Sequence, residues 1–320
     1  MSTLLVYLNP GSLSAEQYDE ISNAIPEMKL LITTEEEEVA KVYDDIEIVA
    51  GWYPGERILR APNLRWYQQW GAGANWLMGF HGADKLSIIV TNVSGLHAVS
   101  MGEHILGMLL IFARKFNHSF KNQSNLKWMP PKENEILELS GKTLLLVGLG
   151  SIGAHAARLA SAMGMKVVGI RRNPSVKSEC VDAVYSPNHL LEILPNVDFV
   201  VLTIPLTHAT KGLVGEKELR AMKSSACIFN VGRGGTIQED ALRRALQEKW
   251  IAGAGLDVFE EEPLPKDSPF WKMDNVVITA HYAGLTPNYD SQAFDIFIEN
   301  LKRYISGKQL KNIVDKNLGY

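Results

Sequence analysis

Short runs of apolar residues recur along the whole chain, and helix-like stretches separate them. A strand that is buried on both faces reads as a continuous apolar run, so this alternation predicts parallel sheets covered by helices on both sides. The runs form two series. They are TLLVYL, KLLIT, IEIVAG, LRWYQQW and SIIVTNV in the first third, and KTLLLVG, KVVGI, DFVVLTI, ACIFNVG, AGAGLDV and NVVITA from residue 142 onward. The pattern predicts an α/β fold with doubly wound parallel sheets.

A long stretch between the two series, His97 to Phe116, is apolar at helical spacing and predicts a helix that leads from the first domain into the second. The polar stretch that follows it, NHSFKNQSNLKWMPP, reads as a loop. Glu35 to Glu38 predict a solvated helix start, because acidic residues are favoured near a helix N-terminus. The closing YDSQAFDIFIENLKRYISG predicts a helix that returns to the first domain.

Length and composition narrow the class of protein. A chain of 320 residues is long for one compact core, so two domains are expected. The net charge of −4 and the absence of a long Lys/Arg run argue against nucleic acid as the main partner. The N-terminal sequence has no basic region typical of a signal peptide, and no apolar run reaches the ~20 residues that span a bilayer. Cys180 and Cys227 lack metal-type spacing, which favours unpaired thiols in the cytoplasm and no metal site.

The stretch KTLLLVGLGSIG places Gly148, Gly150 and Gly153 at GxGxxG spacing. A strand precedes the glycines, and a helix of small residues follows them before the next strand. In this context Gly148 allows the tight turn, Gly150 lets the backbone approach a pyrophosphate, and Gly153 lets the helix pack on the strand. The helix N-terminus then offers free N–H groups to the phosphates. The context favours a dinucleotide site over a glycine-rich turn that binds no ligand.

The next strand ends in VVGIRRNP, which carries Arg171 and Arg172. About 20 residues beyond the glycines, NAD-binding units place an Asp or Glu that binds the ribose 2′-OH. Two guanidinium groups at this position suit a 2′-phosphate instead, since each can bind it through two hydrogen bonds. NADPH is therefore the expected cofactor, with NADH as the alternative. In the competing interpretation the arginines are surface residues paired with Glu179 or Asp182.

Three later stretches place polar residues just past apolar runs, at the strand ends where ligands bind in open α/β sheets. FNVGRGG carries Arg233, LDVFEEEPLP carries Glu260 to Glu262, and VVITAHYAG carries His281. An arginine, a carboxylate and a histidine beside a nicotinamide suit the reduction of a 2-oxo acid. Arg233 would bind the substrate carboxylate, His281 would protonate the carbonyl oxygen, and Glu262 would favour the imidazolium and orient the ring. Taken singly, each residue also has a purely structural explanation.

Together these stretches resemble the D-isomer-specific 2-hydroxyacid dehydrogenases. The resemblance runs from about residue 88 to the C-terminus, on the motifs VGLGSIG, TIPLTHATKGLV, FNVGRGG, GLDVFEEEPLP, ITAHYAG and ENLKRYISGKQLKNIVD, and it is looser in the first domain. It implies a flavodoxin-like substrate domain (1–97 and 284–320), an inserted Rossmann domain (98–283), an active site in the cleft between them, a D-2-hydroxy acid product and a homodimer.

The resemblance also assigns roles to residues. The catalytic arginine, glutamate and histidine fall on Arg233, Glu262 and His281, which places Glu262 directly before PLP. Residues that line the cofactor site are Gly148, Gly150, Ser151, Ile152, Gly153, Arg171, Arg172, Pro205, Thr210, Val231 and Asp257, the last on the nicotinamide carboxamide. The first-domain loop WGAGAN receives the substrate carboxylate near Gly73 and Ala74.

The chain departs from the family at several positions. Asn75 stands where many members carry an acidic residue, and Arg171 replaces the acidic residue of NAD-dependent relatives, as in the glyoxylate and hydroxypyruvate reductases that prefer NADP. Tyr282 follows the catalytic histidine where many members have a smaller or aliphatic residue, and would narrow the pocket or donate a hydrogen bond. Formate dehydrogenases of the superfamily have Gln at the position of Glu262, which argues against formate oxidation.

Three functions are consistent with this sequence. The first is an NADPH-dependent reductase of small 2-oxo acids, with glyoxylate, hydroxypyruvate, phenylpyruvate, 2-oxoisocaproate and ketopantoate all open as substrates. The second is a cofactor-sensing binding protein of the same fold without essential turnover. The third is an NAD-dependent dehydrogenase that oxidises a D-hydroxy acid, which a 2′-phosphate site at the arginines would exclude.

Other polar and aromatic residues are given structural roles. His97 and His104 have too few convergent ligands for a metal, so we expect them at a domain junction or dimer interface. Trp66, Trp70 and Trp76 are expected in the core rather than lining the cleft.

Overall fold

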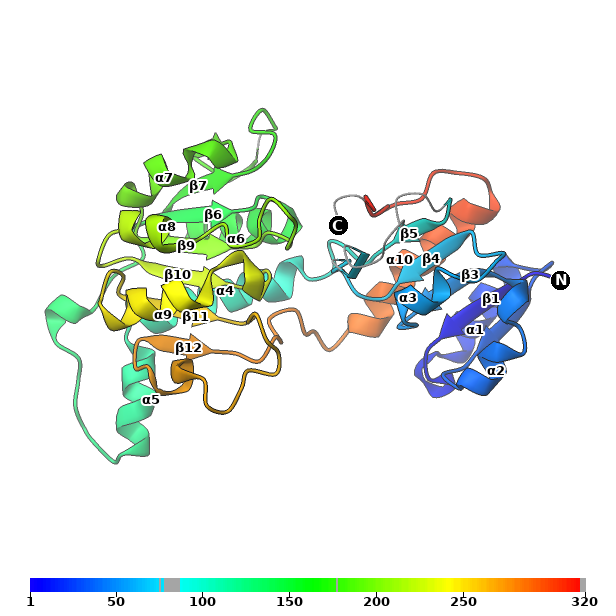
Figure 1. Cartoon of the computed structure of the whole chain (residues 1–320), viewed down its shortest axis with the longest axis horizontal. Helices are drawn as coiled ribbons and strands as arrows, with labels where there is room; N and C mark the ends of the chain where they lie inside the picture. Colours follow the sequence, from blue (N-terminus) through cyan, green and yellow to red (C-terminus); the bar gives the residue numbers. More distant parts are fainter. Residues whose placement is uncertain (75, 78–86, 177, 317–320) are drawn as a thin grey trace. The chain divides into compact units, whose positions relative to one another are not determined.

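The computed structural model describes residues 1–74, 76–77, 87–176 and 178–316 (Figure 1). The chain divides into two compact units. One comprises Met1–Leu96 with Thr286–Tyr320, and the other comprises His97–Leu285. Each unit is built on a parallel sheet with helices on both faces, so the predicted fold class is confirmed.

The first unit has a five-stranded parallel sheet in the order β2-β1-β3-β4-β5, which is the flavodoxin-like order. Its strands are β1 (Thr3–Tyr7), β2 (Lys29–Ile32), β3 (Ile46–Gly51), β4 (Trp66–Gln69) and β5 (Ile89–Thr91). Its helices are α1 (Ala15–Ala24), α2 (Glu36–Ala40), α3 (Gly55–Ile58) and α10 (Tyr289–Ile305). The strand runs of the first series and the helix start at the glutamates are therefore confirmed.

Helix α10 returns to the first unit, as its apolar spacing predicted. Its Phe297 and Leu301 are fully buried in the cluster that also contains Trp66, Trp70 and Ile21. Both tryptophans are core residues, and the indole N–H of Trp66 donates to Thr91 Oγ1 at 2.8 Å. The opposite face of the sheet buries side chains of α2 and α3.

The second unit has a seven-stranded parallel sheet in the order β12-β11-β10-β9-β6-β7-β8. Its strands are β6 (Thr143–Val147), β7 (Lys166–Ile170), β8 (Ala183–Tyr185), β9 (Phe199–Leu202), β10 (Cys227–Asn230), β11 (Gly253–Leu256) and β12 (Val276–Ile278). Its helices are α4 (Ala98–Ala113), α5 (Phe116–Ser124), α6 (Ser151–Ala162), α7 (Leu190–Ile193), α8 (Glu216–Ala221) and α9 (Glu239–Gln247). The chain turns to one side of β6 and then to the other, as in a Rossmann fold, so the switch point lies between β6 and β9.

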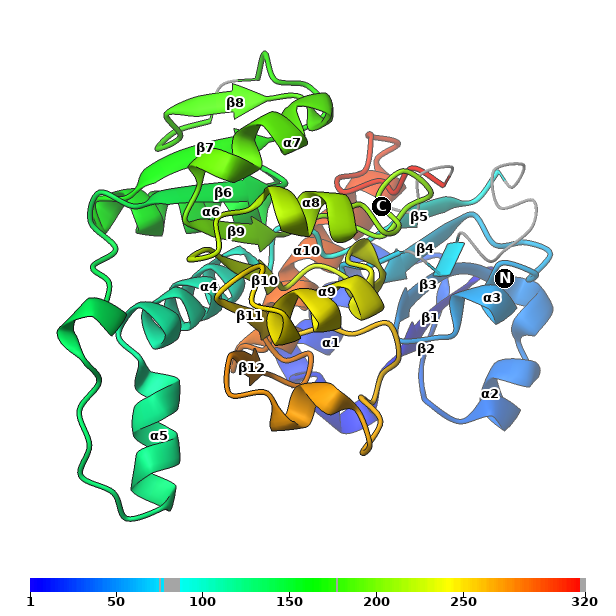
Figure 2. The same ribbon diagram turned by 60° about the vertical axis from the view of Figure 1, so that its left-hand side comes forward.

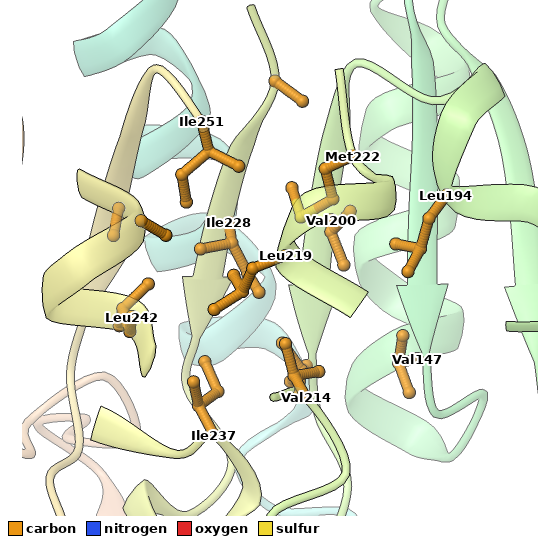
Figure 3. Close-up of a cluster of buried hydrophobic side chains, with 14 of the residues drawn as sticks. Val147, Leu194, Val200, Val214, Leu219, Met222, Ile228, Ile237, Leu242 and Ile251 are labelled. Atoms are coloured by element: carbon orange, nitrogen blue, oxygen red, sulfur yellow. The ribbon is translucent and has the colours of Figure 1, made fainter. Parts of the chain in front are cut away.

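Helices cover both faces of this sheet, as Figure 2 shows. Helices α4 and α6 pack on one face, where Phe112 and Phe229 meet edge to face with ring centroids 5.4 Å apart. Helices α7, α8 and α9 cover the other face, where Leu219, Ile228 and Leu242 lie in the cluster drawn in Figure 3. Full burial of such a side chain stabilises the fold by about 1.5–3 kcal/mol. The two layers hold the carboxyl ends of the strands in fixed positions.

The sequence-based interpretation was wrong for the stretch after α4, because residues 116–124 form helix α5 rather than a loop. This helix buries no side chain of its own, so no apolar stripe announced it. Two of its polar side chains hold it to the loop before β12. Lys121 Nζ lies 2.6 Å from both carboxylate oxygens of Asp274, and Asn117 Nδ2 donates to the main-chain oxygen of Asp274. Strand β8 was also missed, since it has three residues and none of them is buried.

Neither a membrane span nor a metal centre is found in the described part of the chain. None of its helices combines the length and the apolar character needed to cross a bilayer. Its His, Cys, Asp and Glu side chains do not form a group of three or more that could hold a metal ion. Cys180 is exposed and Cys227 is buried, and both are free thiols as predicted.

Candidate active site

The glycine loop lies between β6 and α6, at the switch point of the second unit. Gly148 has a φ of +111°, which side chains other than hydrogen disfavour. A Cβ on Gly153 would lie 2.1 Å from the main-chain oxygen of Gly148, so α6 can pack this close to the strand only with glycine there. Gly148 and Gly153 therefore have the predicted local roles.

Gly150 differs from the other two glycines, because a Cβ on it would meet no atom of the described residues within 4 Å. Neither its φ of −81° nor the packing of the protein requires glycine at this point. A close approach of a ligand to the backbone does explain it. Gly150 caps α6, which begins at Ser151 and runs for 12 residues with its first N–H groups directed toward this loop. The loop thus fits a dinucleotide pyrophosphate.

A cavity of about 490 Å³ adjoins the glycine loop. Its lining comprises Leu149, Gly150, Ser151, Ala154, Arg158, Arg171, Ser178, Glu179 and Cys180. Arg171 comes from the end of β7 and Arg158 from α6, so two separate elements supply the guanidinium groups. Glu179 supplies one carboxylate, which leaves the lining with a net positive charge suited to a phosphate.

The structure separates the two neighbouring arginines. Arg171 lines the cavity, while Arg172 is exposed and is not among the lining residues. Within the described chain Arg171 makes no ion pair with Glu179 or Asp182. The Asp182 carboxylate instead accepts a hydrogen bond of 2.7 Å from the Val167 amide. The competing explanation, an arginine–carboxylate surface pair, therefore does not hold for Arg171.

Other residues assigned to the cofactor lie in the same unit. Ser151 and Ile152 are the first two residues of α6, and Val231 is buried just after β10. Pro205 and Thr210 belong to one turn after β9, since Thr210 Oγ1 donates to the Pro205 oxygen at 2.6 Å.

Arg233, Glu262 and His281 follow β10, β11 and β12, which are adjacent in the sheet. The His281 ring donates from Nδ1 to Glu262 Oε2 at 2.6 Å. A second hydrogen bond, from the Phe259 amide to Glu262 Oε1 at 2.9 Å, fixes the carboxylate. Because Nδ1 is engaged in this way, Nε2 is the ring nitrogen available to a substrate.

Arg233 lies close enough to Glu262 for the two charges to interact. Burial lowers the pKa of the Arg233 guanidinium, and the Glu262 charge opposes that effect. The group stays charged, since an arginine in a protein keeps its proton. Its Nη1 donates to the Gly232 oxygen at 2.7 Å. The structure thus brings the three residues together, because Glu262 is hydrogen-bonded to His281 and its charge acts on Arg233.

Asn230, which the sequence analysis did not single out, shapes the loop that carries Arg233. This fully buried side chain donates from Nδ2 to the Arg233 oxygen at 2.9 Å and accepts from the Gly232 amide at 3.1 Å. Gly234 lets the same loop pack against the end of β11, because a Cβ there would lie 1.9 Å from a main-chain carbon of Phe259. The only sequence signal was an asparagine at the end of a strand.

Asp257 holds the turn that presents His281. Its main-chain oxygen accepts from the His281 amide at 2.8 Å, and its Oδ1 accepts from the Tyr282 amide at 3.1 Å. The Ala283 amide donates to both carboxylate oxygens, at 3.3 and 3.2 Å. His281 has a φ of +52°, in the left-handed region that costs free energy for residues other than glycine and is common at functional sites.

Known proteins match this architecture and these motifs. The family model "D-isomer specific 2-hydroxyacid dehydrogenase, NAD binding domain" matches residues 106–283. A glyoxylate reductase from Korarchaeum cryptofilum is 35% identical over 81% of this chain and 78% of its own length. One from Pyrococcus furiosus is 33% identical over 93% of this chain and 88% of its own. The chain belongs to the D-isomer-specific 2-hydroxyacid dehydrogenases.

The structural comparison agrees with this membership. An NADPH-dependent glyoxylate/hydroxypyruvate reductase from Sinorhizobium meliloti, solved with NADP and sulfate, superposes with a TM-score of 0.84 at 27% identity and full coverage of both chains. This dehydrogenase is therefore an oxidoreductase with a nicotinamide-dinucleotide-binding domain in its second unit.

The first unit of the dehydrogenase carries the loop predicted to receive the substrate carboxylate. Gly73 is half-buried, and its oxygen accepts from Gln69 Nε2. Ala74 is buried, and Asn75 lies outside the described residues. The side chain of Gln69 also accepts from the Trp76 indole at 2.7 Å, so this glutamine shapes the loop from within.

Sequence reasoning missed Arg158 because it considered only the arginines at the end of the strand. Arg158 lies on α6 one turn beyond Ala154, which lines the same cavity. This spacing puts both residues on one face of the helix and could have indicated it.

Proposed function

We propose that this dehydrogenase reduces a small 2-oxo acid to the D-2-hydroxy acid with NADPH. The observation that carries the proposal is the His281–Glu262 hydrogen bond beside the half-buried Arg233, in the unit that holds the glycine loop. The two glyoxylate reductases and the Sinorhizobium meliloti enzyme support the substrate class. Residues 98–283 are the dinucleotide domain in this proposal, and 1–97 with 284–320 form the substrate domain.

The side chains divide the work as follows. Arg233 binds the substrate carboxylate with its forked N–H groups and orients the neighbouring carbonyl. His281 donates the Nε2 proton to the carbonyl oxygen, and Glu262 keeps the ring in the orientation that makes this transfer direct. Asp257 keeps the turn of His281 in place and would help to hold the nicotinamide of the cofactor, which would supply the hydride when bound. In the reverse direction His281 takes up the proton from the hydroxyl.

The cavity beside the glycine loop supports the choice of NADPH. Arg171 and Arg158 both line it, and an NAD-specific acidic residue is replaced by Arg171. Two structures with similar folds, from Sinorhizobium meliloti and Xanthobacter autotrophicus, were solved with NADP and NADPH. In this proposal the exposed Arg172 contributes a further positive charge that attracts the 2′-phosphate of NADPH.

Initial rates of the purified protein test the function and the cofactor together. We expect NADPH to be oxidised faster than NADH with glyoxylate or another acid from a panel that includes hydroxypyruvate, phenylpyruvate, 2-oxoisocaproate and ketopantoate. Arg171→Asp with Arg172→Ala should reverse this preference, raising the KM for NADPH about 100-fold, because about 3 kcal/mol of charge-assisted hydrogen bonding is lost. Arg158→Ala should raise that KM about tenfold and leave the KM for NADH within about twofold.

Each contrary result has its own meaning. Equal rates with both cofactors in the wild type would reject the NADPH preference, and faster oxidation of NADH would favour an NAD-dependent dehydrogenase. Tight dinucleotide binding without turnover on any 2-oxo acid would favour a cofactor-sensing protein. Arg220→Ala is the matched control, since this helix arginine pairs with Glu216 and lies outside the cavity.

We further propose that the enzyme acts as a homodimer in the cytoplasm, a location consistent with its two free thiols. Helix α5 and the residues after it expose large apolar side chains, namely Phe116, Phe120, Leu126, Trp128 and Met129. Trp128 is fully exposed and Leu126 nearly so, with relative accessibilities of 101% and 96%. An apolar surface of this kind is typical of a subunit interface.

Light scattering coupled to size-exclusion chromatography tests this interface. Leu126→Glu with Trp128→Glu should convert a dimer into a monomer, because two charges would have to be buried without partners. Tyr185→Glu is the control, since this exposed tyrosine lies on β8, at the edge of the sheet opposite to β12 and the loop that α5 contacts. A wild-type monomer, or a double variant that remains a dimer, would contradict the proposal.

A further inference from the structure

Three polar side chains from separate parts of the second unit form a hydrogen-bonded chain. His104 lies on α4, Asp257 follows β11 and Thr279 follows β12. His104 Nε2 lies 3.2 Å from Thr279 Oγ1, and Thr279 Oγ1 lies 2.6 Å from Asp257 Oδ1. These hydrogen bonds therefore link a helix that covers the sheet with the turn that presents His281.

The protons in this chain have only one arrangement when Asp257 is ionised. A carboxylate only accepts hydrogen bonds, so the single hydroxyl proton of Thr279 is given to Asp257. The Thr279 oxygen must then accept from His104, which places a proton on His104 Nε2. Burial lowers the pKa of His104, with the Asp257 charge opposing, so the ring is neutral near pH 7 and Nε2–H is its tautomer.

At the other end of this series of hydrogen bonds, Asp257 holds the backbone of the turn that carries His281. Asp257 Oδ1 accepts from Thr279 and from the amides of Tyr282 and Ala283, whereas Ala283 is the only donor to Oδ2 among the residues that the structure describes. The hydroxyl of Thr279 thus fixes which oxygen binds the turn, and Oδ2 keeps most of its capacity to accept another donor. In the described chain no Lys or Arg pairs with Asp257 within 4.0 Å, so neutral donors alone compensate its buried charge.

The His104 ring is itself held in place by the residue after the catalytic histidine. The rings of His104 and Tyr282 meet edge to face, with centroids 5.5 Å apart and planes at 86°. Tyr282 therefore touches both ends of the arrangement, through its ring at His104 and through its amide at Asp257. A side chain at position 104 that filled the same space without an N–H group would keep this packing and lose the donor.

We propose that His104 is a positioning residue for the proton transfer, acting through Thr279 and Asp257 on the turn that carries His281. The hydrogen bond from His104 polarises the Thr279 hydroxyl and strengthens its bond to the carboxylate. The carboxylate in turn keeps the His281 backbone at its left-handed conformation and the ring on Glu262. The inference rests on the proposed function, because its readout is the reductase reaction.

Matched variants at His104 and Thr279 separate a role in hydrogen bonding from a role in packing. His104→Leu removes the donor and His104→Gln retains a side-chain N–H. Thr279→Val removes the hydroxyl at nearly equal volume and Thr279→Ser retains it. The double variant His104→Leu with Thr279→Val tests whether the two positions act through one chain. Each protein is measured for kcat and KM with the best 2-oxo acid, for Kd of NADPH by fluorescence titration, and for Tm.

We expect His104→Leu and Thr279→Val each to lower kcat about tenfold, since each weakens a hydrogen bond of a charged group. The KM for the oxo acid should stay within about threefold, because Arg233 is untouched. His104→Gln and Thr279→Ser should keep kcat within about threefold of the wild type. The double variant should be no slower than Thr279→Val alone. Once the Thr279 hydroxyl is gone, His104 has no group through which to act, so its removal should cost nothing more.

Two results would overturn the inference. One is an equal loss of kcat in His104→Leu and His104→Gln, which would make His104 a packing residue. The other is a double variant whose loss is the product of the two single losses, which would make the sites independent. If His104→Leu does not fold, His104→Phe replaces it in the same comparisons, because phenylalanine keeps a ring against Tyr282 and has no N–H donor. A wild type without turnover rejects the proposed function instead, so the two failures are distinguishable.

Discussion

Replacing His281 is expected to have the largest effect on catalysis. His281→Asn should lower kcat for the reduction of the 2-oxo acid by about 10²–10⁴, the range that a general acid contributes. Asparagine is the informative substitution because it tolerates the left-handed conformation of residue 281 better than alanine does. The loss then reports the missing proton donor rather than a relaxed backbone. Steady-state rates with NADPH and the best 2-oxo acid measure it.

Two further measurements make this result specific. The Kd for NADPH should remain within about threefold of the wild type, since His281 is not among the residues that line the cavity beside the glycine loop. Glu262→Gln should give a smaller loss than His281→Asn, because glutamine keeps an oxygen for the Nδ1 hydrogen bond and loses only the charge. If His281→Asn turned over at the wild-type rate, the acid would be another group.

Replacing Arg233 is expected to have the second-largest effect and a different kinetic signature. Arg233→Ala should raise the KM for the 2-oxo acid and lower kcat, with a combined loss in kcat/KM of about 10²–10³. A charged, forked pair with the substrate carboxylate contributes about 3–4 kcal/mol when both hydrogen bonds are made. The loss also reaches kcat because the same contact orients the carbonyl toward His281.

The lysine variant separates charge from geometry at this position. Arg233→Lys keeps the positive charge next to Glu262 but cannot make the planar two-bond contact, so it should recover only part of the loss. Equal kcat/KM in Arg233→Ala and the wild type would remove the arginine from the substrate site. A loss confined to the KM for NADPH would place it on the cofactor instead.

The arrangement of the strands explains why three loops that are distant in sequence converge. Strands β10, β11 and β12 are adjacent and parallel, so their carboxyl ends meet at one edge of the sheet. Each loop is then held by a buried polar side chain at that edge, Asn230 under the Arg233 loop and Asp257 under the His281 turn. The groups that we propose as catalytic therefore take their positions from the sheet.

Much of the fold could be predicted from short-range patterns. Apolar runs identify strands that are buried on both faces, and helical spacing identifies α4 and α10, because both signals are local. Helix α5 could not be predicted in this way. Its sequence FNHSFKNQS lacks an apolar stripe, and its contacts with Asp274 join residues that are more than 150 positions apart. Strand β8 has three residues and is only partly buried at the sheet edge, so its apolar pattern is equally weak.

The features of the candidate site also fall into those that local sequence predicts and those that depend on the tertiary structure. The sequence alone determined the glycine loop, the identity of the three groups at the strand ends and the arginine in place of an acidic residue, because each is a residue type at a fixed distance from a strand. The tertiary structure decided that Arg158 shares a cavity with Arg171, and that His104 reaches Asp257 through Thr279. Those relations depend on which side chains of separate elements meet in space, and packing of the whole chain determines that.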